Sequence, residues 1–505
     1  MTTSTIPIQN GQSIPLKKIP CVSISKFQEI VLTSVSRGGR ICALWGSHWE
    51  HQSQLRIMAI VENENNSLEI TTSLVEKHFP SLAQECPQIQ AFEREIWEQW
   101  GVYPEHHPWL KPIRFQKPLQ PIQSDKVHPR PAIDTMDFFQ VFGEEIHEVG
   151  VGPVHAGVIE PGHFRFQCHG EEVIHLEITL GYQHRGVEEA LWHGPHARSL
   201  HHAETLSGDT SIGHAWAYSQ VVEALMQLNH KISFKAELIR GLALELERLA
   251  NHIGDLGALA NDIGFLSTSA FCGRLRGNVL NLTALLCGNR FGRNLIRLGG
   301  VRFDLEASRK TELLKKLETI VEETQQAVQL LWKESSVLSR FEGTGILTES
   351  MARNLGLVGF SARACGLKRD VRLTHPWGIY QSQRLPISIQ KTGDVFARAY
   401  VRWLEIQASV RWIQNSLTHM PQGELLIPLE KLQPNSVALA MIEGWRGEIM
   451  HIALTDPQGR FQRYKIVDPS FHNWMGLAIA LRHQPISDFP LCNKSFNLSY
   501  CGHDL

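Results

Sequence analysis

Two runs of alternating apolar and polar side chains, joined by a short polar turn, dominate residues 152–188. The runs cover residues 164–168 and 174–180, and Gly170 lies in the turn between them. A period of two is typical of strands with one buried face, and a glycine in a short connection favours a hairpin. Histidine, arginine and glutamate side chains crowd the loops on both sides. The stretch therefore predicts a rigid hairpin that presents loops, where binding and catalytic residues usually lie.

Beyond this hairpin, apolar side chains recur at steps of three and four over three long segments. These segments are residues 238–253, 313–331 and 394–417. Such spacing predicts amphipathic helices, and long helices close together in the chain indicate a bundle around one core. Near the end, residues 449–454 and 461–467 flank an Asp-Pro-Gln-Gly turn, which predicts a second hairpin.

The first part of the chain has a different pattern. Residues 41–45, 55–61 and 68–71 are rich in strand-forming side chains, and an asparagine-rich turn separates the last two. Residues 91–102 carry apolar side chains at four-residue steps, which predicts a helix that stops at Gly101. A small α/β domain is therefore expected here.

A proline-rich segment separates the two parts. Four prolines between residues 116 and 134 predict a semi-extended linker. We therefore expect a small α/β docking domain at residues 1–115 and a mainly helical domain, with β-hairpins at its start and end, at residues 135–505. The predicted fold class is α+β.

Composition limits the class of protein. A formal net charge of -2 gives no argument for a nucleic-acid partner. No apolar run approaches the roughly 20 residues that a membrane-spanning helix needs, and the N-terminus lacks an apolar signal core. The nine cysteines form no C-x-x-C pair and suit reduced thiols. We therefore expect an intracellular protein that reaches a membrane only through partners.

The hairpin stretch also carries a family resemblance. The sequences GPVHAGVIEPGHFRF at residues 152–166 and GYQHRG at residues 181–186 resemble the large subunit of membrane-bound (group 4) nickel–iron hydrogenases. More distantly, they are similar to the quinone-site subunit of respiratory complex I. EREIWEQWGV at residues 93–102 resembles the small hydrophilic subunit of complex I, an assembly module without a redox centre. Matching pieces continue in order from residue 245 to residue 474, so the resemblance covers nearly the whole chain.

This resemblance implies the large subunit of a membrane-associated, respiratory-type oxidoreductase complex. Its expected place is the cytoplasmic side of the membrane, where partner subunits would hold it peripherally. The implied partners are a small iron–sulfur subunit, a ferredoxin-like subunit and antiporter-like membrane subunits. Iron–sulfur clusters would lie in those partners and not in this chain.

In the hydrogenases of this family, four cysteine thiolates hold the nickel and the iron. The matching positions here are Ser207, Thr210, Ser499 and Gly502, and Cys501 falls one residue short. Soft thiolates suit a low-valent metal centre, whereas a serine hydroxyl stays protonated near neutral pH and is a hard ligand. We therefore expect this chain to hold neither a nickel–iron centre nor another metal.

The quinone pocket of complex I offers a second comparison. That pocket uses two histidines, a tyrosine and an aspartate, of which the first histidine and the aspartate are matched by His155 and Asp262. Ile159 stands in place of the second histidine, and Ser207 in place of the tyrosine. A quinone needs a proton donor at each carbonyl. A quinone-like acceptor is therefore one alternative, with an incomplete set of donors.

The resemblance gathers these side chains, with others, around one cavity. Ser207 and Thr210 either take part in chemistry there or fill the space that the metals leave. Arg363 and Asp370 either line the cavity or form a buried structural ion pair. The candidate catalytic residues are His155, Ser207, Thr210, Asp262, Arg363 and Asp370, and the candidate cofactor-binding residues are Ser499, Gly502 and Arg185.

Two further candidates have structural alternatives of their own. His155 either moves protons or orients the hairpin loop. Arg185 either contacts a cofactor or ties its loop to neighbouring segments. Both residues lie in the loops that the first hairpin presents.

Three functions remain open from the sequence. The first is a redox subunit that reduces a quinone-like acceptor in the remodelled cavity. The second is a non-catalytic scaffold that docks an iron–sulfur partner and passes strain to the membrane arm. The third is a hydrogenase with atypical ligands.

Overall fold

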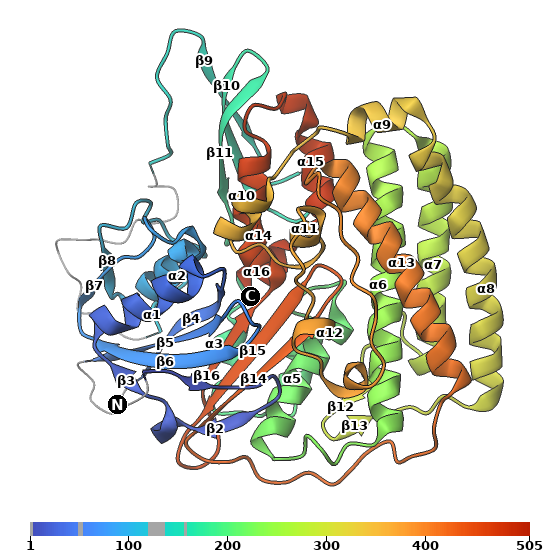
Figure 1. Ribbon diagram of the computed structural model, residues 1–505, viewed down its shortest axis with the longest axis horizontal. Coiled ribbons are helices and arrows are strands. Elements are labelled where there is room, and N and C mark those ends of the chain that lie inside the picture. The colour runs from blue at the N-terminus through green and yellow to red at the C-terminus, as the bar shows by residue number, and fades with distance from the viewer. Residues whose placement is uncertain (1–3, 49–53, 120–136, 156–158) are drawn as a thin grey trace.

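The computed structural model describes residues 4–48, 54–119, 137–155 and 159–505. The N-terminal part lies on the left of Figure 1, a helix bundle lies on the right, and long C-terminal strands run between them. This arrangement confirms the predicted α+β class, with an α/β part first and a mainly helical part after it. Most of the predicted linker lies outside the described residues, and the domain boundaries stay a prediction.

The N-terminal sheet is built on the three predicted strands. β4 (Arg40–His48), β5 (Leu55–Glu62) and β6 (Leu68–Val75) are antiparallel neighbours. Two short strands, β1 (Ile6–Pro7) and β3 (Cys21–Val22), both pair with β6. The predicted strands are therefore confirmed and are longer than their apolar runs.

Two helices pack on this sheet. α1 (Ile24–Ser36) begins after Ser23, whose side chain accepts a hydrogen bond from Lys26 N. α2 (Gln90–Trp100) ends at Gly101, which has a φ of 71°. This left-handed conformation favours glycine, so the predicted helix stop is confirmed.

The first predicted hairpin is also confirmed, but it belongs to a sheet of three strands. β10 (His163–His169) pairs with β11 (Glu172–Thr179), and Phe166 lies opposite Leu176. The third strand, β9 (Ile146–Val151), pairs with the other edge of β10. Phe166 and Leu176 are buried, so the apolar face of the alternation packs inward.

The second predicted hairpin is also confirmed, and it lies at one edge of another sheet. β15 (Glu448–Thr455) and β16 (Phe461–Val467) are the predicted pair, and β14 (Ser436–Glu443) lies on the other side of β15. β2 (Ser13–Pro15), from the N-terminal part, pairs with the free edge of β14. Buried side chains of β14 and β15 share one hydrophobic core with the N-terminal sheet, so the two parts pack as one body.

The helix bundle contains the three predicted helices and one that was not predicted. α6 (Phe234–Asp262), α8 (Ala307–Gln329) and α13 (Val395–Thr418) confirm the periodic segments, and α7 (Leu266–Cys287) joins them. Within the described part of the chain, no helix combines the length and the apolar character that crossing a membrane requires.

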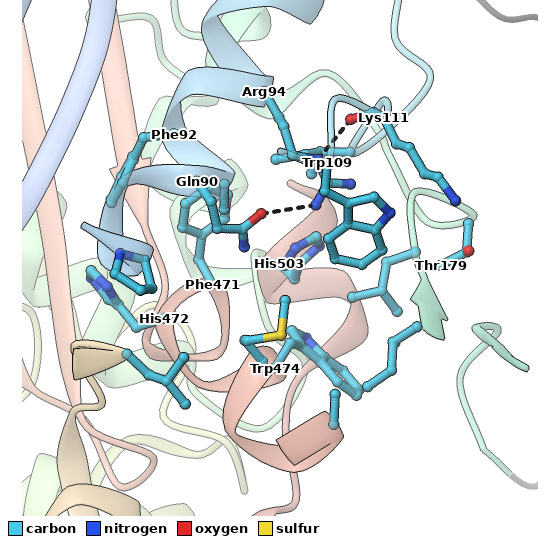
Figure 2. Close-up of a pocket in the computed structure, with 18 of the residues that line it drawn as sticks. Gln90, Phe92, Arg94, Trp109, Lys111, Thr179, Phe471, His472, Trp474 and His503 are labelled. Carbon is cyan, nitrogen blue, oxygen red and sulfur yellow. Dashed lines mark hydrogen bonds between the residues drawn. The ribbon is translucent and has the colours of Figure 1, made fainter. Parts of the chain in front are cut away.

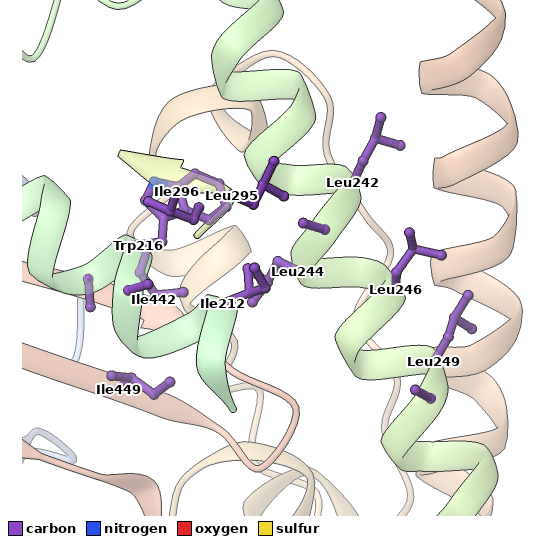
Figure 3. Packing of buried hydrophobic residues seen from close by; sticks show 14 of the residues in the cluster. Ile212, Trp216, Leu242, Leu244, Leu246, Leu249, Leu295, Ile296, Ile442 and Ile449 are labelled. Atoms are coloured by element: carbon purple, nitrogen blue, oxygen red, sulfur yellow. The ribbon is translucent and has the colours of Figure 1, made fainter. Parts of the chain in front are cut away.

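α5 (Ser211–Leu225) connects this bundle to the C-terminal sheet. All of its residues are buried, because α6 packs on one side and β14 and β15 pack on another. In Figure 3, Ile212 and Trp216 of α5 lie between Leu244 of α6 and Ile449 of β15. The core therefore holds α5 rigidly, together with the turn that precedes it.

The remaining elements are short or lie near the site. The helices are α3 (Val187–Ala190), α4 (Ser199–Glu204), α9 (Ser335–Phe341), α10 (Glu349–Asn354), α11 (Gly359–Ala364), α12 (Val371–Thr374), α14 (Pro469–Ala480), α15 (Phe489–Phe496) and α16 (Tyr500–Asp504), and the strands are β7 (His78–Pro80), β8 (Tyr103–Glu105), β12 (Ile296–Arg297) and β13 (Gly300–Val301).

Candidate functional site

Three segments far apart in the sequence meet beside the N-terminus of α5. They are the turn before α5 with Ser207 and Thr210, the β14–β15 turn with Arg446, and the start of α16 with Ser499. We call these four residues, together with Asp209, the hydroxyl cluster. The four are buried, whereas the side chain of Asp209 is 31% exposed. The cluster therefore lies just beneath the surface.

The Arg446 guanidinium forms the centre of the hydroxyl cluster. Its two terminal nitrogens donate to the two carboxylate oxygens of Asp209 at 2.6 and 2.8 Å. One of them also lies 3.4 Å from Ser207 Oγ and 3.3 Å from Thr210 Oγ1. The guanidinium carbon lies 3.9 Å from the ring centre of Trp445, whose Nε1 donates to Thr210 Oγ1 at 3.1 Å. These contacts hold the planar guanidinium group of Arg446 in one orientation.

Ser499 closes the hydroxyl cluster on the side of α16. Its Oγ lies 3.0 Å from Ser207 Oγ and accepts a hydrogen bond from Gly502 N at 2.9 Å. Gly502 has no room for a side chain, because a Cβ there would lie 2.6 Å from Asp468 Oδ2. A cysteine at this position would therefore have to displace a buried carboxylate.

This donor set does not fit a nickel–iron centre. The resemblance requires four thiolates, and the matching positions carry three hydroxyls and a hydrogen atom. The Arg446 guanidinium crosses the space between the hydroxyls, so its positive charge would face any metal cation. The thiol next to these positions is Cys501, and burial raises its pKa to about 11. It is therefore protonated at neutral pH and is a poor ligand.

Two carboxyl groups near the cluster have opposite pKa shifts. Burial alone would raise the pKa of Asp209, but the Arg446 guanidinium lowers it to about 2. Glu247 of α6 accepts hydrogen bonds from Ile212 N at 2.7 Å and Gly213 N at 3.2 Å, at the start of α5. Burial nevertheless raises the pKa of Glu247 to about 8. The site thus holds one ionised carboxylate and one carboxyl that keeps its proton near neutral pH.

A buried chain of hydrogen bonds leads away from the cluster. Asp468 Oδ2 lies 3.1 Å from His214 Nε2, His214 Nδ1 lies 3.1 Å from His451 Nε2, and His451 Nδ1 lies 2.9 Å from Tyr464 Oη. Burial and the neighbouring His214 lower the pKa of His451 well below its usual value, so this ring is neutral. The two imidazole rings thus join the tyrosine hydroxyl to the Asp468 carboxylate. Such a chain can shift a proton toward Asp468.

Arg363 and Asp370 lie in a separate group of buried charges. Arg363 donates to Glu405 Oε1 through Nε at 2.9 Å and to Glu443 Oε1 at 2.7 Å. Asp370 pairs with Arg372 at 2.6 Å and lies 3.7 Å from Arg363. We call these five residues the Arg363 network. Every member is buried and multiply paired, as the structural alternative for Arg363 and Asp370 predicts.

Two predicted site residues, His155 and Arg185, form hydrogen bonds that hold loops next to the cluster. His155 Nε2 lies 2.9 Å from Gly162 O, within the loop that precedes β10. Arg185 donates to the carbonyl oxygens of Thr205 and Leu206, both at 2.8 Å. Arg185 therefore ties its loop to the turn that carries Ser207, and both contacts agree with the loop-holding alternatives.

Asp262 lies apart from these groups. It is the last residue of α6 and is exposed. Partial burial raises its pKa, and the charge of Lys494 acts in the opposite direction. Among the described residues, no hydrogen bond or ion pair joins Asp262 to the hydroxyl cluster.

Sequence reasoning did not select four residues that now stand out. These are Asp209, His214, Glu247 and Arg446, and each lies inside a stretch that matched the family. Charged or imidazole side chains within those stretches were therefore the available signal. Their partners come from distant parts of the chain, so the sequence alone could not rank them.

A hollow with a volume of about 80 Å³ lies between α2, β11 and α14. Figure 2 shows Trp109 at its rim beside Arg94 and Lys111, whose cations lie 4.9 and 5.6 Å from the indole ring centre. Arg94 Nε also donates to Lys111 O at 2.7 Å. None of the predicted site residues lines this hollow. It therefore belongs to the contact between the N-terminal part and the rest of the chain.

Comparison with known families agrees with the resemblance. Residues 262–438 match the family described as "Respiratory-chain NADH dehydrogenase, 49 Kd subunit". Residues 25–129 match the family described as "Respiratory-chain NADH dehydrogenase, 30 Kd subunit". Both matches fall on one continuous chain, in the order expected from the motifs.

Individual relatives come from both branches. Formate hydrogenlyase subunit 5 of Escherichia coli (strain K12) is 29% identical over 444 residues, which cover 84% of this chain and 77% of the relative. Membrane-bound hydrogenase subunit alpha of Pyrococcus furiosus is 27% identical over 367 residues, covering 69% and 85%. An NADH-quinone oxidoreductase subunit of Dehalococcoides mccartyi is 30% identical over 332 residues, covering 65% and 90%.

Proposed function

The chain belongs to the family that joins the 49-kDa subunit of complex I with the large subunits of group 4 nickel–iron hydrogenases, here fused to a 30-kDa-like part. From this premise, we propose that it is the large subunit of a respiratory-type oxidoreductase complex whose nickel–iron site is lost. The proposal is carried by one observation. Three hydroxyls stand at positions that match metal-binding thiolates, and the Arg446–Asp209 ion pair lies among them.

The assembly follows from the same premise. Electrons arrive through two partners, a small iron–sulfur subunit and a ferredoxin-like one, and antiporter-like membrane subunits form the membrane arm. The chain lies peripherally on the cytoplasmic side and couples electron transfer to that arm. Support comes from the Pyrococcus furiosus relative, which is named as a membrane-bound hydrogenase subunit.

The acceptor in this proposal is an organic molecule of the quinone class. Gly208 is exposed and the side chain of Asp209 is partly exposed, so a ligand can approach the hydroxyl cluster from this edge. Ser207 Oγ and the Arg446 guanidinium offer hydrogen-bond donors, and Glu247 holds a proton near neutral pH. Donors fixed by their surroundings stabilise developing negative charge on a reduced carbonyl oxygen.

A second candidate is a non-catalytic coupling scaffold. The hydroxyls of Ser207, Thr210 and Ser499 already have hydrogen-bond partners inside the cluster. Such a paired cluster also suits a rigid contact that transmits strain between partner subunits. The two candidates differ in whether changes to the cluster alter turnover.

The test uses the purified whole complex. Elemental analysis is expected to find nickel well below one atom per chain. Turnover is measured with reduced viologen as electron donor and decylubiquinone as acceptor. Arg446→Gln is expected to lower it roughly tenfold, because the negative charge that develops on the quinone oxygen loses a charged hydrogen-bond donor. Arg460→Gln is the matched control, since Arg460 is exposed and pairs with Asp456 outside the cluster.

Each outcome separates the candidates. Ser207→Ala and His155→Ala are measured beside Arg446→Gln, with the composition of the complex as a check on assembly. Unchanged turnover in all three variants of an intact complex would favour the scaffold. Stoichiometric nickel, with evolution of dihydrogen, would overturn the proposal and favour a hydrogenase with atypical ligands.

A further inference from the structure

A hollow of about 340 Å³ opens in the helix bundle, along the seam between α8 and α13. These helices are neighbours on the right of Figure 1, and the hollow extends between them to α6 and α7. Its inner walls are apolar and buried. They include Leu249 and Ile253 of α6, Leu317 and Ile320 of α8, and Ile406 and Val410 of α13.

The size of the hollow sets it apart from packing defects. Protein interiors pack densely, and voids much larger than a water molecule cost dispersion contacts. Pockets that bind small molecules begin at about 300 Å³. The hollow near α2 and α14, at about 80 Å³, is well below that size. The seam therefore has room for an organic ligand.

The rim of the hollow is polar on the solvent side. It carries the amides of Gln325, Gln407 and Gln414 and the guanidinium of Arg411. These four side-chain groups form no hydrogen bond or ion pair with any residue that the structure describes. Arg411 is exposed, so its cation stands free at the mouth of an apolar chamber. A charge in this place complements an anionic head group on an apolar body.

The shape of the hollow favours an extended ligand. On α13 its lining runs from Trp403 to Gln414, which spans roughly 16 Å at the helical rise of about 1.5 Å per residue. The buried walls carry no charged side chain that could pair with the phosphate of a nucleotide or a sugar phosphate deep inside the hollow. An aliphatic chain can lie along the seam with its head at the rim.

We propose that this seam binds a fatty carboxylate, with the chain between α8 and α13 and the carboxylate at Arg411. The inference is independent of the redox role, because the seam shares no residue with the hydroxyl cluster. Each methylene that enters the hollow tightens binding about fourfold, until the apolar length is filled. Reversing the charge at the rim weakens binding without changing the walls.

The test is calorimetric titration of the delipidated complex with laurate. Arg411→Glu is expected to weaken binding at least about fivefold, because a favourable charge pair becomes repulsive. Val410→Trp is expected to abolish binding by filling the hollow. Lys315→Glu is the matched control, since Lys315 is exposed on α8 and does not line the seam. It should bind laurate as the parent does.

Two further measurements keep the proposal falsifiable. Dodecylammonium has the same chain with a cationic head, and it should bind more weakly than laurate. Octanoate and decanoate test the gain per methylene. Equal binding of both head groups, or laurate affinity that Arg411→Glu leaves unchanged, would overturn the proposal. Failure of the parent complex to bind laurate would also overturn it. A partner protein that crosslinks to position 411 would then be the occupant of this surface.

Discussion

The hydroxyl cluster and the Arg363 network lie on either side of Trp445 and use charge in different ways. Trp445 Nε1 donates to Thr210 of the cluster, and its ring lies 6.2 Å from that of His252, whose Nε2 is 2.9 Å from Glu405 of the network. The network is buried throughout, whereas Asp209 gives the cluster a partly exposed edge. Both regions are rich in polar side chains, but only the cluster can be approached.

This difference separates structural charge from a candidate site. Arg363 bridges α13, through Glu405, and β14, through Glu443, so its charges fix elements of the core. The cluster has one ion pair, and its remaining members are neutral hydroxyls. Neutral groups near a surface can exchange partners with a ligand at little cost, whereas a buried charge cannot lose its partner. Burial and charge alone therefore do not mark a functional site.

The largest expected effect comes from the Arg363 network. Arg363→Ala should lower the free energy of unfolding by about 3–5 kcal/mol, because Glu405 and Glu443 lose a buried cation. Urea unfolding of the purified chain measures this change. Arg340→Ala is the matched control: Arg340 pairs with Asp488 at 2.7 Å but is exposed, so its loss should cost below about 1 kcal/mol. Similar costs for both variants would remove the contrast between the two regions.

The next effect tests whether the position of the fourth metal ligand is closed. Gly502→Ala should cost about 1–3 kcal/mol, because the added methyl group would lie 2.6 Å from Asp468 Oδ2. Gly277→Ala in α7 is the matched control, since a Cβ there meets nothing within 4 Å. That change should be neutral or stabilising, because alanine favours helix. If Gly502→Ala were equally neutral, the site would be open enough for a larger side chain.

Much of this fold was predictable because its elements have strong periodicity. The first hairpin was predicted from alternation, the second from the turn that residues 449–454 and 461–467 flank, and the long helices from helical spacing. β14 was missed because all of its residues are buried, so it shows no alternation, and it does not adjoin the Asp-Pro-Gln-Gly turn that marked the equally buried β15. α5 was missed for the same reason, since core residues surround it on every side. β2 is a three-residue strand whose partner lies more than 400 residues away in the sequence.

The candidate site was predictable only in part. The resemblance located Ser207 and Ser499, which prove to be 3.0 Å apart although they are 292 positions apart in the chain. It did not identify Arg446, because the pairing with Asp209 depends on how the β14–β15 turn meets the start of α5. Side-chain partners set by tertiary packing leave no local pattern in a single sequence.

The pH dependence of stability should differ in sign between the two regions. Burial raises the folded-state pKa of Glu247 to about 8, above its unfolded value, so its contribution to stability falls as pH rises toward 8. Glu247→Gln removes this titration. Between about pH 6 and pH 7, the parent should lose roughly 1 kcal/mol relative to the variant. Urea unfolding at several pH values measures the difference.

Glu405 of the network provides the opposite case. Burial would raise its pKa, but Arg363 lowers it well below the usual value. Its stabilising contribution is therefore present above the unfolded-state pKa and is lost as pH falls through the folded-state pKa. If the stability of the parent relative to Glu247→Gln stayed constant or rose between about pH 6 and pH 7, Glu247 would not be protonated as inferred.

The smallest expected effect compares two buried serines. Ser207→Ala should cost about 0.5–1 kcal/mol, because Asp209 keeps Arg446 and Ser499 keeps Gly502 N as partners. Ser409 of α13 donates to Glu245 Oε2 at 2.5 Å, next to the Arg363 network. Glu245 is fully buried, so water cannot replace the lost donor as it can at the partly exposed Asp209, and Ser409→Ala should cost about 1.5–3 kcal/mol.

The same chemical change should thus cost less in the hydroxyl cluster than beside the network. Urea unfolding of both variants at one pH makes the comparison direct. A ligand site requires hydroxyls that can give up their present hydrogen-bond partners for the ligand. Binding then breaks no contact that the fold depends on. Equal costs at the two serines would mean that Ser207 is fixed as rigidly as the network, which would favour the scaffold over an acceptor site.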